Sequence, residues 1–181
     1  MNAKPNLVLV GFMGTGKTVA GRIAAARLGL DLVDMDEVIE ARAGRRIPDI
    51  FAESGEAHFR RLERALAQEL GGRSGLAVTA GGGVVLNPDN VLDLGRSGIV
   101  VCLRASPDVI LARVAGETHR PLLENGEKRQ RILDLLETRK PLYDAIPLQV
   151  DTSALTPEEA AARVIEIYER EAPRKAAGPA P

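Results

Sequence analysis

The sequence predicts an α/β fold, with a mostly parallel sheet covered by helices on both faces. Five short apolar runs suit buried strands: Leu7–Val10, Asp31–Asp34, Ala77–Ala80, Ile99–Leu103 and Leu148–Val150. Helical patterns separate these runs, and strands alternating with helices at this spacing imply right-handed crossovers between parallel strands. Ligands of such sheets bind at the carboxyl ends of the strands. The order of the elements thus predicts which edge of the sheet carries the site.

Capping residues mark the ends of the intervening helices. The first helix is predicted over Lys17 to Leu28, because Gly29 suits a left-handed C-terminal cap. Apolar stripes predict helices over Glu56 to Leu70 and from about Glu127 to Lys140. Three more helices are predicted where a capping residue precedes a first-turn proline, at Asn87-Pro88, Ser106-Pro107 and Thr156-Pro157, the last with Glu159 as a capping box.

The length of the chain fits one domain. Of its 181 residues, we assign 1–171 to a single compact enzyme domain. Residues 172–181 are rich in Pro, Ala and Gly, and we expect them to form a disordered tail. The segment 115–127 carries two glycines, a proline and mixed charges, which is typical either of a mobile lid or of a plain surface loop.

Composition excludes several kinds of partner. The 24 basic and 25 acidic side chains nearly cancel, so no global basic field attracts nucleic acid or an anionic membrane surface. No apolar stretch approaches the ~20 residues that a membrane-spanning helix needs. Cys102 is the only cysteine, and neither His58 nor His119 has metal-ligand spacing with it, so we expect no disulfide and no zinc site. These features predict a cytoplasmic protein that acts on small molecules, and we expect it to be a monomer.

A phosphate-binding motif follows the first strand. Residues 11–18 read Gly-Phe-Met-Gly-Thr-Gly-Lys-Thr, which fits the P-loop pattern between a strand and a helix. The glycines let successive N–H groups face a phosphate, and the helix N-terminus adds a positive dipole. Lys17 can reach the β- and γ-phosphates, and the Thr18 hydroxyl can ligate the bridging Mg²⁺. The predicted ATP-binding segment is Gly14, Thr15, Gly16, Lys17, Thr18 and Val19.

Two aspartates stand at the end of the second predicted strand. Asp34 and Asp36 point the same way if the strand continues through them, and a phosphoryl-transfer site needs carboxylates for the metal and the acceptor hydroxyl. The same pair could instead cap the next helix. Its place after a P-loop favours the catalytic interpretation.

Two arginines are candidates for holding an anionic acceptor. Arg60 shares a helix face with Glu56 and Glu63, although an arginine in such a pattern is usually a solvated surface residue. Arg139 continues the apolar stripe of its helix, so its charge is expected to be buried and to need a partner. That partner is either a protein carboxylate or an anionic substrate group held in bidentate fashion.

A run of three glycines, Gly81–Gly83, follows the third predicted strand directly. Glycines at the ligand edge of a sheet suggest a close approach of the backbone to a ligand. The competing interpretation is an ordinary flexible turn.

These motifs together resemble those of the shikimate kinases along the chain from about Leu7 to Glu171. Beside the P-loop, the resemblance is carried by Asp34-Met-Asp36, Ile47 to Phe51, Gly55-Glu56 with Phe59-Arg60 and Glu63, Gly81–Gly83, Arg120 to Leu123 and Arg139 to Tyr143. It implies a three-layer, nucleoside-monophosphate-kinase-like P-loop fold with strand order 2-3-1-4-5 and a mobile lid. It also implies phosphorylation of the 3-hydroxyl of shikimate by ATP with Mg²⁺, in aromatic amino acid biosynthesis.

The resemblance further implies a role for each matching residue. Lys17, Asp36 and Arg120 would be catalytic, with Asp36 on the acceptor hydroxyl and Arg120 arriving with the lid, while Thr18 and Asp34 would hold the metal. ATP would also contact Arg113, beside adenine, and Arg120. The shikimate-binding residues would be Asp36, Arg60, Gly81, Gly82, Gly83 and Arg139. Two departures from the family pattern, Thr18 for a common serine and Ala80 for threonine or leucine, remove no required functional group.

Two other functions share these features. A kinase for another small acceptor, such as gluconate or a nucleoside monophosphate, would have the same P-loop and fold. A non-catalytic nucleotide-binding protein would use the same scaffold, but the presence of Lys17, Asp36 and Arg120 argues against it.

Overall fold

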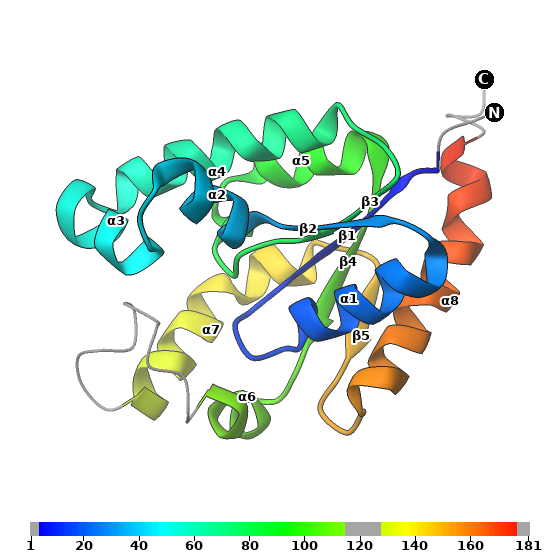
Figure 1. The fold of residues 1–181 in the computed structure, drawn as a ribbon. Coiled ribbons are helices and arrows are strands. Elements are labelled where there is room, and N and C mark those ends of the chain that lie inside the picture. The colour runs from blue at the N-terminus through cyan, green and yellow to red at the C-terminus, as the bar shows by residue number, and fades with distance from the viewer. Residues whose placement is uncertain (1–3, 115–127, 177–181) are drawn as a thin grey trace.

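The structure is a computed structural model that describes residues 4–114 and 128–176. Within them, five parallel strands form one sheet in the order β2-β3-β1-β4-β5 (Figure 1). The strands are β1 Asn6–Gly11, β2 Asp31–Asp34, β3 Leu76–Thr79, β4 Gly98–Arg104 and β5 Gln149–Asp151. Both the parallel sheet and the predicted strand order are confirmed. Most strand ends lie one residue from the predicted position.

The helices begin and end close to the predicted capping residues. They are α1 Lys17–Leu28, α2 Met35–Ala43, α3 Ile47–Ser54, α4 Glu56–Gly71, the 3-10 helix η1 Val84–Leu86, α5 Pro88–Ser97, α6 Pro107–Val114, α7 Lys128–Asp144 and α8 Pro157–Ala176. Gly29 caps α1 in the left-handed conformation, as predicted. Thr156 and Glu159 bond each other's backbone N–H groups across the first turn of α8. The capping box is therefore confirmed.

Two predicted boundaries are wrong. Helix α8 continues to Ala176, because Ala172 still packs on the core and so extends the helix into the segment predicted as a tail. Helix α7 extends beyond Lys140 to Asp144 and contains Pro141. The predicted lid, 115–127, and residues 177–181 lie outside the described residues. No helix in the described ranges is long and apolar enough to cross a membrane.

The sheet separates two hydrophobic layers. Alternate residues of β1 point to opposite faces, so Leu7 and Leu9 pack with α1 and α8 while Val8 and Val10 pack with α2 to α5. Figure 1 shows α1 and α8 on one side of the sheet and α4 and α5 on the other. Burial on both faces explains why the strands read as continuous apolar runs.

The register of the strands places the candidate residues at one edge of the sheet. Thr79, at the end of β3, lies opposite Leu9 of β1 and Asp34 of β2. The P-loop, the Asp34–Asp36 segment and Gly81–Gly83 therefore leave the sheet side by side. This is the edge that the parallel topology predicted for ligands.

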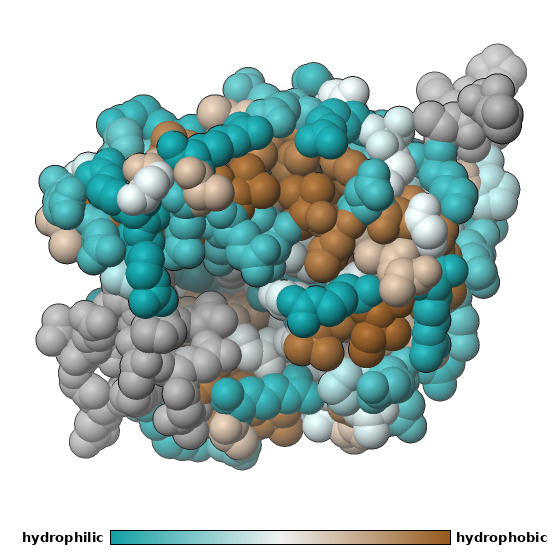
Figure 2. All heavy atoms as spheres, viewed as in Figure 1, coloured by the Kyte–Doolittle hydropathy of each residue, from teal (hydrophilic) through white to brown (hydrophobic). Residues whose placement is uncertain are grey.

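The face of the molecule in Figure 2 is mostly hydrophilic. Among the described residues, the exposed large hydrophobic side chains are Val19, Leu32, Leu86 and Leu92, which are 49%, 39%, 39% and 66% exposed. Strand β2 is an edge strand, but it has only four residues and an aspartate at each end. Short, charged edge strands resist pairing with other chains.

Gly71 allows α4 and α5 to approach closely. A Cβ added at Gly71 would lie 2.4 Å from the Asp93 carbonyl oxygen, whereas one at Gly72 would meet nothing nearer than 3.5 Å. We therefore expect Gly71→Ala to destabilise the protein by about 1–3 kcal/mol through overpacking, despite the better helix propensity of alanine. Urea unfolding measures this effect.

The matched control for this prediction is Gly72→Ala. It changes the neighbouring residue in the same way without the clash, and we expect it to alter stability by less than about 1 kcal/mol. Equal stability of the two variants would contradict the close packing of α4 on α5.

Candidate active site

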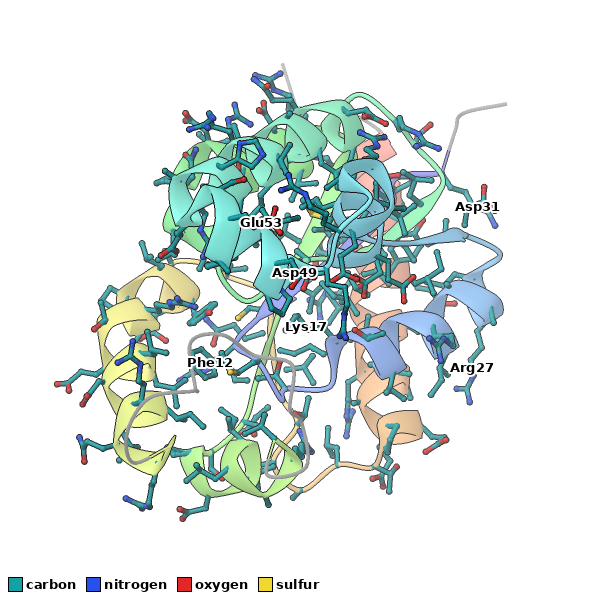
Figure 3. The ribbon with its side chains drawn as sticks, turned by 60° about the vertical axis from the view of Figure 1, so that its left-hand side comes forward. Phe12, Lys17, Arg27, Asp31, Asp49 and Glu53 are labelled. Atoms are coloured by element: carbon teal, nitrogen blue, oxygen red, sulfur yellow. The ribbon has the colours of Figure 1, made fainter. Side chains whose placement is uncertain are left out.

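The P-loop is built to hold an anion. Gly14 and Gly16 have φ values of 72° and 92°, which favour glycine, and they turn the loop into the start of α1. No side chain of the described residues caps the first turn of α1, so its N–H groups are available to a phosphate. The Lys17 ammonium donates to the Phe12 carbonyl oxygen at 2.9 Å. This contact holds Lys17 folded over the loop, between the α2–α4 helices and the α6–α7 helices (Figure 3).

Asp34 has two functions in the structure. Its Oδ1 accepts from the N–H groups of Asp36 and Glu37, so it caps α2. Its Oδ2 accepts from the hydroxyls of Thr18 at 3.2 Å and Thr79 at 2.8 Å. Because α2 begins at Met35, the strand does not continue through both aspartates. Asp34 is thus an N-cap and also lies beside the P-loop threonine.

Thr18 and Asp34 could contribute oxygen ligands to Mg²⁺. This ion binds few protein ligands and keeps several waters together with phosphate oxygens. Among the described residues, no group of three or more His, Cys, Asp or Glu side chains could hold a metal. A pair of hard oxygens next to a phosphate loop fits a nucleotide-bound Mg²⁺ better than a dedicated protein cage.

The triple glycine lies against three functional groups. A Cβ at Gly81 would lie 2.7 Å from Asp36 Oδ1, and one at Gly83 would lie 2.4 Å from Arg60 Nη1. A Cβ at Gly82 would lie 3.3 Å from the Met13 nitrogen of the P-loop. The absence of side chains therefore lets one short segment contact the P-loop, the candidate acceptor carboxylate and the candidate arginine.

Arg60 is held by two carboxylates of its own helix. It pairs with Glu56 at 2.9 Å and Glu63 at 3.0 Å, and only 23% of its side chain is exposed. It is therefore not the solvated surface arginine that its sequence pattern alone suggested. Burial raises the pKa of Glu63 against the opposing charge of Arg60, while Asp36 adds to the rise. Burial opposes the charge of Arg60, but Glu63 and Glu56 more than offset this, so the pKa of Arg60 is raised.

The sequence predicts that Glu63 shares a helix face with Arg60, but it does not predict Glu63 as a site residue. Glu63 is 2% exposed, and the charges of Arg60, Asp36 and Arg139 all influence its pKa. Its position three residues after Arg60 on a helix was the available signal. Glu63 is therefore the buried carboxylate that holds the Arg60 guanidinium.

Arg139 is a buried charge that faces aromatic rings. It is 5% exposed, and its guanidinium carbon lies 5.9 Å from the centre of the Phe12 ring. Its charge also opposes the rise that burial causes in the pKa of Tyr143. No carboxylate of the described residues forms an ion pair with it. The sequence left two possible partners for the Arg139 charge, a protein carboxylate and an anionic substrate group. The described residues do not supply the carboxylate.

Arg113 joins α6 to the P-loop. Its guanidinium donates to the carbonyl oxygens of Gly14 at 3.1 Å and Thr152 at 2.8 Å. The Thr152 hydroxyl in turn donates to the Thr15 carbonyl oxygen at 3.0 Å. Sequence reasoning did not identify Thr152 or Thr79, because each acts through contacts with residues far away along the chain.

The structure thus gathers most of the predicted site residues around the P-loop. Asp36, Arg60, Gly81–Gly83 and Arg139 lie on the side of α2, α4 and α7, and Arg113 lies on the side of α6. Val19 is 49% exposed on the first turn of α1. Arg120 lies outside the described residues.

Three comparisons with known proteins agree. The shikimate kinase family matches residues 13–169. A shikimate kinase of Thermodesulfovibrio yellowstonii is 45% identical over 165 residues, which cover 91% of this chain and 95% of that protein. The solved structure of an Acinetobacter baumannii shikimate kinase in complex with shikimate has a TM-score of 0.88 and 34% identity, covering 94% of this chain and 96% of that chain. A gluconokinase of Sinorhizobium meliloti, with a TM-score of 0.62, 18% identity and 95% and 96% coverage, shares the fold alone.

Replacing Glu63 by glutamine tests the cost of its buried charge. The pKa of Glu63 in the folded protein is raised above its ordinary value of 4.5. The protonated Glu63 carboxyl therefore contributes stability below that pH, and this contribution is lost as the pH rises through the folded pKa and the carboxyl ionises. Glutamine does not ionise, so its contribution to stability does not change with pH. We expect Glu63→Gln to gain stability relative to the parent chain as the pH rises above 4.5, as measured by urea unfolding at several pH values.

Glu56→Gln is the matched control, because it removes the other carboxylate from the same arginine. Glu56 is 49% exposed, so we expect a weaker dependence of its stability difference on pH. A Glu63→Gln difference that stays constant, or falls, as the pH rises would show that Arg60 fully compensates the buried carboxylate.

Proposed function

The chain belongs to the shikimate kinase family, and we propose that it transfers the γ-phosphoryl group of ATP to the 3-hydroxyl of shikimate. The product is shikimate 3-phosphate, an intermediate of aromatic amino acid biosynthesis. The observation that carries the proposal is Arg139, a guanidinium that is 5% exposed and has no ion-pair partner within the described residues. A buried cation of this kind needs an anion, and the carboxylate of shikimate supplies one.

The acceptor lies between α4 and α7 in this proposal. Arg60 and Arg139 grip the carboxylate, since a planar guanidinium suits bidentate contact with it. The backbone of Gly81–Gly83 forms one wall of the pocket. Asp36, beside Gly81, orients the acceptor hydroxyl and takes up its proton. Phosphoryl transfer passes through a loose transition state, so positioning supplies much of the rate.

The P-loop and its neighbours hold the donor. Backbone N–H groups and Lys17 bind the phosphates and balance the charge on the transferred group. Arg113, tied to Gly14 and Thr152, lies beside adenine. Thr18 and Asp34 would hold Mg²⁺ directly or through a bound water. The bound ion would neutralise charge on the phosphates.

A lid over the nucleotide completes the site. Segment 115–127 is proposed to close over ATP and bring Arg120 to the phosphates, which ties charge stabilisation to the exclusion of water. These residues lie outside the described ranges. We propose that the enzyme acts as a cytoplasmic monomer, since its nearly balanced charge favours small-molecule partners.

The direct test is ADP release by the purified chain with Mg²⁺-ATP and one acceptor at a time. We expect release with shikimate and little with gluconate or nucleoside monophosphates. Of these acceptors, only shikimate carries its carboxylate on a small rigid ring, and this is the shape that the proposed site fits. Asp36→Asn keeps the shape of the side chain but removes its charge, and we expect it to lower turnover by ~10²-fold or more. Release that does not depend on shikimate, or that is faster with gluconate, would contradict the proposed acceptor.

A further inference from the structure

Tyr143 connects the acceptor side of the site to the P-loop. It is 5% exposed and lies one helical turn after Arg139 on α7. Its hydroxyl donates to the Gly82 carbonyl oxygen at 2.6 Å. Its ring meets the Phe12 ring edge-on, with centroids 6.5 Å apart and planes at 89°. One side chain therefore contacts both the glycine segment and the P-loop, one helical turn from Arg139.

The contact with Gly82 reaches the middle of the glycine segment. Gly82 packs on the P-loop, while its neighbours Gly81 and Gly83 pack on Asp36 and Arg60. A shift of the Gly82 carbonyl would therefore move the backbone that contacts both acceptor residues. The bond spans 61 residues of sequence, which is why no local pattern points to it.

Two contacts of Tyr143 hold its ring: the edge-on contact with Phe12 and the hydroxyl bond to Gly82. A cavity of about 380 Å³ borders Tyr143 and is lined also by Phe12, Leu103 and Leu136. Because the hydroxyl bond is the contact with the glycine segment, it sets where the ring lies relative to Gly82. Burial raises the pKa of Tyr143 to about 12, so the hydroxyl keeps its proton.

We propose that Tyr143 is a positioning residue for the acceptor: its hydroxyl fixes the Gly82 carbonyl and so aligns Gly81–Gly83 and Arg139 around the acceptor. This inference rests on the proposed function, because shikimate is the acceptor by which it is measured. It assigns Tyr143 no contact with the reacting atoms.

The protein contains a matched control for the test. Tyr168, the other of its two tyrosines, is also 5% exposed and donates to a backbone carbonyl, that of Pro5, at 2.8 Å. It lies on α8, in the hydrophobic layer that α1 and α8 form on the opposite face of the sheet. Tyr143→Phe and Tyr168→Phe each remove one buried hydroxyl bond to a carbonyl, but only the first touches the acceptor side.

The experiment compares kinetics and thermal melting of the two variants with the parent chain. We expect Tyr143→Phe to raise the KM for shikimate about 3- to 10-fold, the usual effect of one lost hydrogen bond. Its KM for ATP should change by less than about twofold. Tyr168→Phe should leave both KM values unchanged while lowering the melting temperature about as much as Tyr143→Phe does, because each loses one comparable bond.

The outcomes separate the two proposals. If the parent chain releases ADP with shikimate, but Tyr143→Phe and Tyr168→Phe have the same KM for shikimate, the positioning role is wrong and the proposed function stands. If the parent chain has no activity with shikimate, the proposed function fails and this inference fails with it. Should Tyr143→Phe not fold, Phe12→Leu removes the ring that Tyr143 and Arg139 pack against. An unchanged KM for shikimate in that variant would overturn the inference.

Discussion

The site depends on the close approach of Gly81–Gly83 to three parts of the chain. With any side chain at Gly81 or Gly83, a Cβ would lie 2.7 Å from Asp36 or 2.4 Å from Arg60. These groups come from α2 and α4, while Gly82 lies against the P-loop that precedes α1. The missing side chains thus set the distance between the phosphate loop and the residues that face the acceptor. The parallel sheet brings all of them to one edge.

Several charges at this edge are held at a cost to stability. Glu63 and Arg139 are almost fully buried, and the raised pKa of Glu63 shows that burial outweighs its pairing with Arg60. Buried ion pairs rarely improve stability over apolar residues of the same size. We therefore attribute Arg60 and Arg139 to the proposed binding of an anionic acceptor rather than to folding.

The sequence predicted the features that depend on local pattern or on topology. Apolar runs located the strands, the P-loop was read from eight consecutive residues, and the helical stripe correctly placed Arg139 in a buried position. Contacts that join distant residues had no such signal. The bonds of Thr79 to Asp34, Thr152 to Thr15 and Tyr143 to Gly82 span 45, 137 and 61 residues. The end of α8 was missed because alanine- and proline-rich sequence resembles a tail until Ala172 is seen to pack.

The most direct measurement of the glycine constraint is the kinetics of Gly83→Ala, with Gly95→Ala as its control. Gly83 has φ −92°, which alanine adopts without strain, so the new methyl would act only by displacing the Arg60 guanidinium. A Cβ at Gly95 would meet nothing nearer than 3.8 Å. We expect Gly83→Ala to keep nearly normal stability and KM for ATP but to raise the KM for shikimate about 10-fold or more, the effect of weakening one charged contact. A KM for shikimate equal to that of Gly95→Ala would contradict the dependence of the acceptor site on this close approach.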